Sequence, residues 1–84
     1  MKLSTIAYAY DTEVNYLIHA CNVTSSLETL KLTEAQYGGE RELFSRIFRD
    51  SDREDRLELF CLFKTKEREF FAARDKAFAR LTKI

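Results

Sequence analysis

The 84-residue chain contains no proline, and its only two glycines, Gly38 and Gly39, are adjacent. Proline and glycine supply most of the tight turns on which all-β folds depend, so their scarcity favours helices. A chain of this length has room for one hydrophobic core and no second domain. The sequence therefore predicts a single all-α domain over residues 1–84.

The N-terminal segment has two possible structures. Its apolar residues recur at helical spacing and would form one stripe on a helix, with Ser4 as the N-cap. This stripe consists of Leu3, Ile6, Ala7, Tyr10, Val14, Leu17, Ile18 and Cys21. The alternative is an α+β fold in which residues 4–10 and 14–22 pair as an N-terminal β-hairpin, because Thr, Ile, Val and Tyr favour strands. A turn at residues 11–13 would lack a glycine to supply a positive φ, so the helix is preferred.

Three capping boxes predict where further helices begin. In a capping box, a Ser or Thr and a Glu or Gln three residues later bind free backbone N–H groups at the start of a helix. The pairs are Ser25 with Glu28, Thr33 with Gln36, and Ser51 with Glu54. We expect short helical structure across residues 26–37, ended or bent by the glycine pair, and another helix across about 40–49. With the first and last helices, this makes a small bundle of about four helical segments.

The clearest amphipathic pattern covers residues from about 53 to 82. At 100° per residue its apolar side chains fall within an arc of about 120°. They are Leu59, Phe60, Phe63, Phe70, Phe71, Ala77, Phe78 and Leu81. A helix of this extent would be roughly 45 Å long, more than a compact domain of this size covers. We therefore expect either a break near residues 64–66 or contact between part of the arc and another molecule.

Two charged residues interrupt this arc, and they suggest how it could pair. Glu67 and Arg74 are seven residues apart and share a heptad position. In an antiparallel pair of these helices centred between Phe70 and Phe71, Glu67 of one chain would lie opposite Arg74 of the other. The sequence thus predicts a homodimer with an interface of Phe60, Phe63, Glu67, Phe70, Phe71, Arg74 and Phe78. The alternative is that both charges reach the edge of the arc and pair within one chain.

A second candidate protein interface lies on the back of the first helix. Tyr8, Tyr16 and His19 would cluster opposite the core stripe, together with Thr12 and Asn15. Tyrosine is enriched at interfaces because it combines a large apolar ring with a hydroxyl group. In the hairpin alternative this cluster would not exist.

Nucleic acid is the alternative partner. Residues 64–84 carry seven basic and three acidic side chains, whereas the whole chain has a formal net charge of zero. Five basic residues could contact phosphates, namely Lys64, Arg68, Lys76, Arg80 and Lys83. The sequence pI near 6.6 is low for a nucleic-acid-binding domain, and Glu69 and Asp75 lie on the same side. A solvated helix face is therefore the preferred interpretation of these residues.

The residues that could carry catalysis or bind a metal are few. His19 is the single histidine, and with Cys21 and Cys61 it would supply three ligands where structural zinc normally has four. The alternating Asp50, Asp52 and Glu54 lack the glycine and the final glutamate of a calcium loop. We therefore expect no catalytic residues, no metal site and no cofactor.

The cellular location is predicted from what the sequence lacks. No stretch approaches the ~20 apolar residues of a membrane span, and Asp11 and Glu13 interrupt the apolar N-terminus before a signal-peptide core could form. We expect a cytoplasmic protein that does not bind membranes and whose cysteines are reduced.

Taken together, these patterns predict a small non-enzymatic protein-binding module, acting as a regulator, inhibitor or adaptor, with nucleic-acid binding as the alternative.

Overall fold

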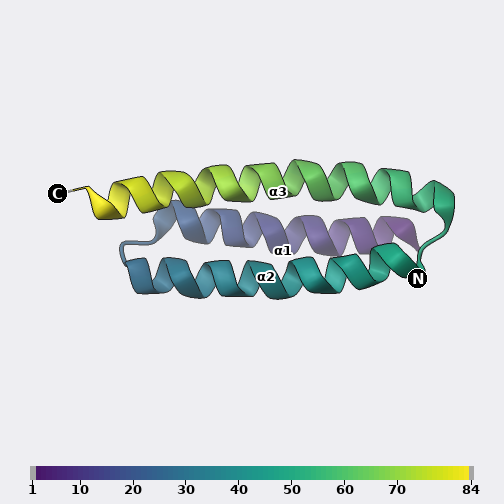
Figure 1. Ribbon diagram of the computed structural model, residues 1–84, viewed down its shortest axis with the longest axis horizontal. Helices are drawn as coiled ribbons and strands as arrows, with labels where there is room; N and C mark the ends of the chain where they lie inside the picture. The colour runs from purple at the N-terminus through teal and green to yellow at the C-terminus, as the bar shows by residue number, and fades with distance from the viewer. Residues whose placement is uncertain (1, 84) are drawn as a thin grey trace.

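The computed structural model describes residues 2–83 and consists of three long helices joined by two short connections (Figure 1). Helix α1 spans Leu3–Val23, α2 spans Leu27–Asp50 and α3 spans Arg53–Thr82. Helix α2 runs antiparallel to its two neighbours, so α1 and α3 point in the same direction. The bundle is a rod of 49 × 17 × 16 Å. Residues 2–83 contain no strand, and the prediction of an all-α helical bundle is confirmed.

The N-terminal segment is one continuous helix, and the alternative hairpin is not formed. Its buried residues are Tyr10, Val14, Leu17 and Cys21, which all belong to the predicted stripe. On a helix these side chains share one face and can all pack against α2 and α3, whereas a strand would divide them between two faces. The N-cap is Lys2 and not the predicted Ser4.

Helix α2 continues through Gly38 and Gly39, so the bundle has three helices and not four. Neither glycine has a positive φ. A helical glycine costs about 1 kcal/mol relative to alanine, but this cost does not break α2. Tyr37 and Phe44, on either side of the glycine pair, are buried, and their packing holds both halves of α2 on one axis.

The observed caps differ from the predicted capping boxes. The N-cap of α2 is Ser26, whose Oγ accepts a hydrogen bond from the backbone N–H of Thr29 at 3.3 Å. Thr33, a predicted cap, lies inside α2. Ser51 ends α2, and its hydroxyl donates a 2.7 Å hydrogen bond to a carbonyl of the last turn. Asp52 then becomes the N-cap of α3.

Helix α3 is unbroken over 30 residues, which confirms its predicted extent. Of the two expectations for this helix, the break near residues 64–66 is therefore wrong, and contact with another molecule stays a prediction. The prediction of a break assumed a compact domain, but the rod shape gives α3 long neighbours on two sides. Arg80 ties its C-terminal end to α1, because the guanidinium donates to the carbonyl oxygens of Thr24 at 2.6 Å and Cys21 at 3.2 Å.

No helix within residues 2–83 is long and apolar enough to cross a membrane.

Aromatic rings fill the core between α2 and α3. Tyr37 stacks on Phe70 with ring centroids 4.0 Å apart, and Phe44 stacks on Phe63 at 5.2 Å. Tyr10 of α1 lies 4.4 Å from the Phe44 ring. These contacts set the position of α2 along α3, with Tyr37 level with Phe70 and Phe44 level with Phe63.

The two helical glycines give a test of the fold. A Cβ added at either position would have nothing within 4 Å, so Gly38→Ala and Gly39→Ala should each stabilise the protein by roughly 0.5–1 kcal/mol. For a domain of this size the expected rise in Tm is several degrees, measured by circular dichroism at 222 nm. Ala35→Gly, at another exposed position of α2, is the control and should lower Tm by a similar amount. A fall in Tm for both alanine variants would contradict the uninterrupted helix.

Candidate functional site

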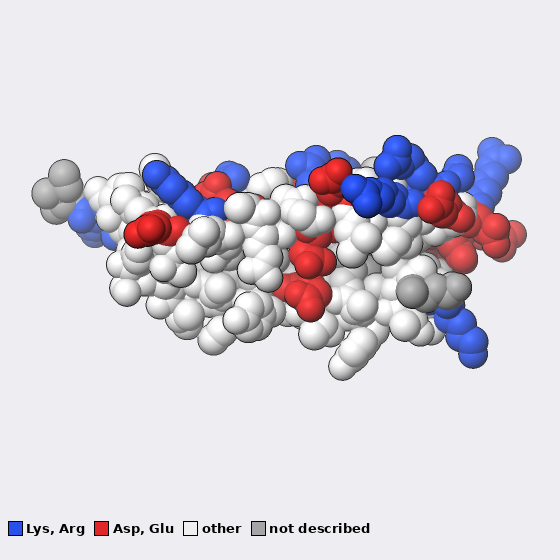
Figure 2. Space-filling model, turned by 90° about the horizontal axis from the view of Figure 1, so that it is seen from below, with Lys and Arg blue, Asp and Glu red and all other residues white. Residues whose placement is uncertain are grey.

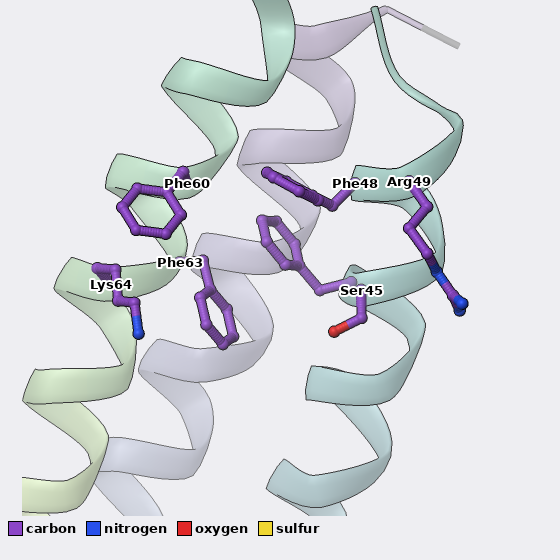
Figure 3. A pocket seen from close by; sticks show the side chains of 7 residues that line it. Ser45, Phe48, Arg49, Phe60, Phe63 and Lys64 are labelled. Carbon is purple, nitrogen blue, oxygen red and sulfur yellow. The ribbon is translucent and has the colours of Figure 1, made fainter. Parts of the chain in front are cut away.

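Two adjoining hollows open between α2 and α3 near the connection between these helices. Figure 3 shows the first of them with the side chains that line it. One has a volume of about 260 Å³, and the other shares Phe48 and Phe60 with it. We refer to the two together as the α2/α3 groove. It is lined by Phe44, Ser45, Phe48, Arg49, Arg53, Arg56, Leu57, Phe60, Phe63 and Lys64.

The interior of the α2/α3 groove is mainly aromatic. The stacked rings of Phe44 and Phe63 lie deepest, because Phe44 is buried and Phe63 packs against the core. Phe60 is 49% exposed and Leu57 is 72% exposed. These two residues are three apart on α3 and therefore neighbours on its surface. Contiguous exposed apolar surface of this kind marks interaction sites in soluble proteins.

The rim of the α2/α3 groove is basic. Arg49, Arg53, Arg56 and Lys64 line it, and no acidic side chain of residues 2–83 does so. The ammonium group of Lys64 lies 5.7 Å from the ring centroid of Phe60, within the range of a cation–π contact. Arg56 is held in place because its guanidinium donates to the backbone carbonyl of Arg49 at 2.9 Å.

Charge is unevenly distributed over the surface. Figure 2 shows that Lys and Arg side chains gather mainly along one long edge of the face in view, while much of that face carries no charge. The exposed apolar side chains of α2 include Leu32 and Leu43.

The structure divides the predicted Phe-rich interface of α3 between core and surface. Phe70 is only 1% exposed and belongs to the core, and Phe63 and Phe71 pack partly against it. Phe60 and Phe78 remain exposed, at 49% and 55%. In the single chain, Phe60 and Phe78 are thus the accessible phenylalanines of the predicted interface.

Glu67 and Arg74 both have partners within the chain. Glu67 lies 3.5 Å from Arg41 and 3.7 Å from Lys64. Arg74 pairs with Asp75 at 2.9 Å, and its guanidinium lies 4.6 Å from the centroid of the Phe71 ring. Both charges are thus paired in the single chain.

The predicted tyrosine cluster lies together on the outer side of α1. Tyr8, Tyr16 and His19 are exposed and face away from the core stripe. They lie on the convex surface of one helix, whereas the α2/α3 groove is formed between two. Of the two predicted protein interfaces within residues 2–83, the Phe-rich one borders the α2/α3 groove.

Two of the five basic residues proposed for nucleic acid have partners within the chain. The guanidinium of Arg80 is committed to the end of α1 through the two hydrogen bonds described above, and Lys64 pairs with Glu67. Arg68, Lys76 and Lys83 are exposed on α3 or just beyond its end.

Cysteine and histidine side chains are dispersed. Cys21 is buried, and burial raises the pKa of its thiol. Cys61 is exposed on α3, and His19 is exposed on α1. Within the part of the chain that the structure describes, no three His, Cys, Asp or Glu side chains are grouped to hold a metal ion.

Sequence analysis missed most of the residues that line the α2/α3 groove. Phe48 and Leu57 complete the α2/α3 groove, and Arg49 lies on its rim. Leu57 could have been found, since it lies three residues before Phe60 and is therefore its neighbour on the surface of a helix. Lys66 was also missed. It joins α3 to α1, with its Nζ 2.7 Å from Asp11. Sequence spacing does not reveal this ion pair, because its two residues lie on different helices. Hydrogen bonds with Asp11 and Glu69 outweigh the effect of burial and raise the pKa of Lys66.

A polar layer crosses the core beside the groove. The hydroxyls of Tyr10 and Tyr37 and the Oε2 atom of Glu67 are buried and have no hydrogen-bond partner among residues 2–83. Burial raises the pKa of Tyr10, and the nearby Tyr37 and Glu67 raise it further. Burial also raises the pKa of Tyr37. Both hydroxyls therefore stay protonated in the folded protein at pH values where a free tyrosine ionises.

Comparisons of this chain with protein-family models, curated proteins and solved structures found no match.

The buried Tyr10 predicts a loss of stability in alkali. An unfolded tyrosine loses its proton near pH 10, while the raised pKa keeps Tyr10 protonated in the fold. Its contribution to stability is thus fully present below about pH 10 and is lost as the pH rises further. Tyr10→Phe has no proton to lose, so its urea midpoint should fall less than that of the wild type between pH 9 and about 11.

Circular dichroism at 222 nm measures these midpoints. Tyr8→Phe changes an exposed ring and should follow the wild type across the range. If the Tyr10→Phe midpoint falls as steeply as that of the wild type, Tyr10 is not the source of alkaline unfolding.

Proposed function

We propose that this protein is a non-enzymatic protein-interaction module whose α2/α3 groove binds apolar side chains of another polypeptide chain. The observation that carries the proposal is the open aromatic interior of the groove. Leu57 and Phe60 stay largely exposed although the bundle buries aromatic rings beside them. A binding partner would remove this apolar surface from water, which is favourable by about 25 cal/mol per Å².

The shape and charge of the groove favour a helical segment as the ligand. Amphipathic helices bind in apolar grooves by inserting a few anchor side chains, and buried aromatic or aliphatic anchors carry most of the binding free energy of an interface. The basic rim of Arg49, Arg53 and Lys64 complements a segment with acidic residues beside its anchors. A module of this kind acts as a regulator, inhibitor or adaptor by covering a surface of its partner.

Photo-crosslinking from inside the groove tests this proposal. A benzoylphenylalanine residue is placed at Ser45, which lines the groove, and the tagged protein is irradiated in native lysate with and without nuclease. We expect a discrete protein adduct that survives nuclease treatment. Phe60→Ser should weaken the binding that gives this adduct by about 2 kcal/mol or more, roughly thirty-fold in affinity.

Leu32→Ser is the matched control, since Leu32 is an exposed leucine of α2 outside the groove. It should leave the adduct unchanged. The same photo-crosslinker at Tyr16 reports on the tyrosine cluster, and protein adducts from Tyr16 alone would move the binding surface to α1. Adducts that disappear with nuclease would favour the nucleic-acid alternative. No adduct from Ser45 would contradict the proposed groove.

A further inference from the structure

An exposed aromatic side chain lies at the far end of the helix that borders the groove. Phe78 is 55% exposed and follows Phe60 by 18 residues, about five helical turns. Both side chains therefore project from the same side of α3. One end of this face thus has a groove lined by Phe rings, and the other end has a projecting Phe.

We infer that the α2/α3 groove binds Phe78 of a second copy of this chain, in a symmetric antiparallel dimer. The inference rests on the proposed function of the groove and names its occupant. With the two α3 helices antiparallel and the twofold axis between Phe70 and Phe71, Phe78 of each copy lies level with Phe63 of the other. Phe63 forms part of the interior of the groove, so both grooves are filled at once. Such self-complementarity is what a twofold interface requires.

The charges around Phe78 match those around the groove. Asp75, one turn before Phe78, has a side chain that is 69% exposed, and Lys64 lines the groove. In the antiparallel register, Asp75 of one copy lies within a helical turn of Lys64 of the other. The basic rim thereby receives an acidic partner beside the apolar anchor, and the pairing occurs twice.

The centre of the same face holds the charged pair that the sequence singled out. Glu67 of one copy lies level with Arg74 of the other in this register. Side-chain exposure is 17% for Glu67 and 33% for Arg74, and their present partners Lys64 and Asp75 are at least half exposed. Glu67 of one copy can therefore pair with Arg74 of the other in place of these partners. Lys64 and Asp75 are exposed to water, so losing their present partners leaves no buried charge unpaired.

Gly38 leaves room for the second copy at the axis. Tyr37 stacks on Phe70, so Gly38 lies close to the level of the twofold axis. It is seven residues before Ser45 and thus shares the side of α2 that borders the groove. A Cβ at Gly38 would have nothing within 4 Å in the single chain. In the dimer this position faces α2 of the second copy, so a large side chain here would hold the two copies apart. Gly39 points to a different side of α2.

The dimer leaves the tyrosine cluster of α1 uncovered. Helix α1 packs on the opposite side of the α2–α3 pair, and Tyr8, Tyr16 and His19 lie on its outer surface. A dimer formed through the groove would therefore present two such clusters, one on each outer side.

Sedimentation equilibrium of the purified full-length chain over a wide concentration range tests the inference. We expect a reversible dimer. Phe78→Ser and Phe60→Ser each remove an anchor contact twice in a symmetric dimer, so each should raise the dissociation constant about a hundred-fold or more. Phe78 and Phe60 are largely exposed, and circular dichroism confirms that the variants remain folded. Leu32→Ser should leave the dissociation constant unchanged.

Charge exchange tests the register. Lys64→Glu and Asp75→Lys should each weaken the dimer about ten-fold, and the two changes in one chain should restore most of the loss, because both pairs form again with reversed sign. Gly38→Leu should weaken the dimer, while Gly39→Leu, its matched control, should not. No restoration in the double variant, or equal effects of the two leucine variants, would overturn the antiparallel register.

The failure of this inference can be distinguished from failure of the proposed function. A chain that stays monomeric at all concentrations, or a dimer that is insensitive to Phe78→Ser, overturns the inference. In that case the proposed function still holds if Ser45 crosslinks to a different protein and Phe60→Ser abolishes the adduct. If Ser45 crosslinks to no protein, including a second copy, both proposals are wrong.

Discussion

The stacking of Tyr37 on Phe70 fixes how α2 lies along α3, and the groove depends on this register. Seven residues further along α2, Phe44 stacks on Phe63. Another seven residues bring Ser51, whose carbonyl accepts a 3.0 Å hydrogen bond from Arg56. The two helices thus share a heptad repeat from the centre of the rod to their connection. The groove opens beside the second of these layers, where α1 packs behind the aromatic rings and leaves their outer side uncovered.

Much of the fold could be predicted from the sequence because long helices with one apolar face leave a clear period. The extent of α3 and the buried stripe of α1 were obtained in this way, and both are confirmed. The prediction failed where local signals opposed the packing. Gly38 and Gly39 weaken α2 locally, but the burial of Tyr37 and Phe44 around them outweighs about 1–2 kcal/mol of helix propensity. Local preference alone could not show this, since the opposing contacts come from another helix.

The candidate site could be predicted only in part, for a related reason. Periodicity shows that Phe60, Phe70 and Phe78 share one side of α3, but not which of them the neighbouring helices cover. That depends on where α2 ends and turns, and the turn at residues 51–52 places Phe48 across from Phe60. Phe70 is buried because Tyr37 of α2 stacks on it, while Phe60 and Phe78 stay exposed. The groove thus results from contacts between helices, and a single-helix pattern identifies only one of its walls.

The charged centre of the α3 face limits how strongly any partner can bind there. In the single chain, Glu67 is paired with Arg41 and Lys64, whose side chains are both about half exposed to water. In the proposed dimer these groups lose water, and their attraction must offset that desolvation before the two Phe78 anchors add net stability. The charges therefore contribute more to register than to affinity, since a shift by one heptad would bring like charges together. A face with apolar ends and a charged centre fits an association that is specific and reversible.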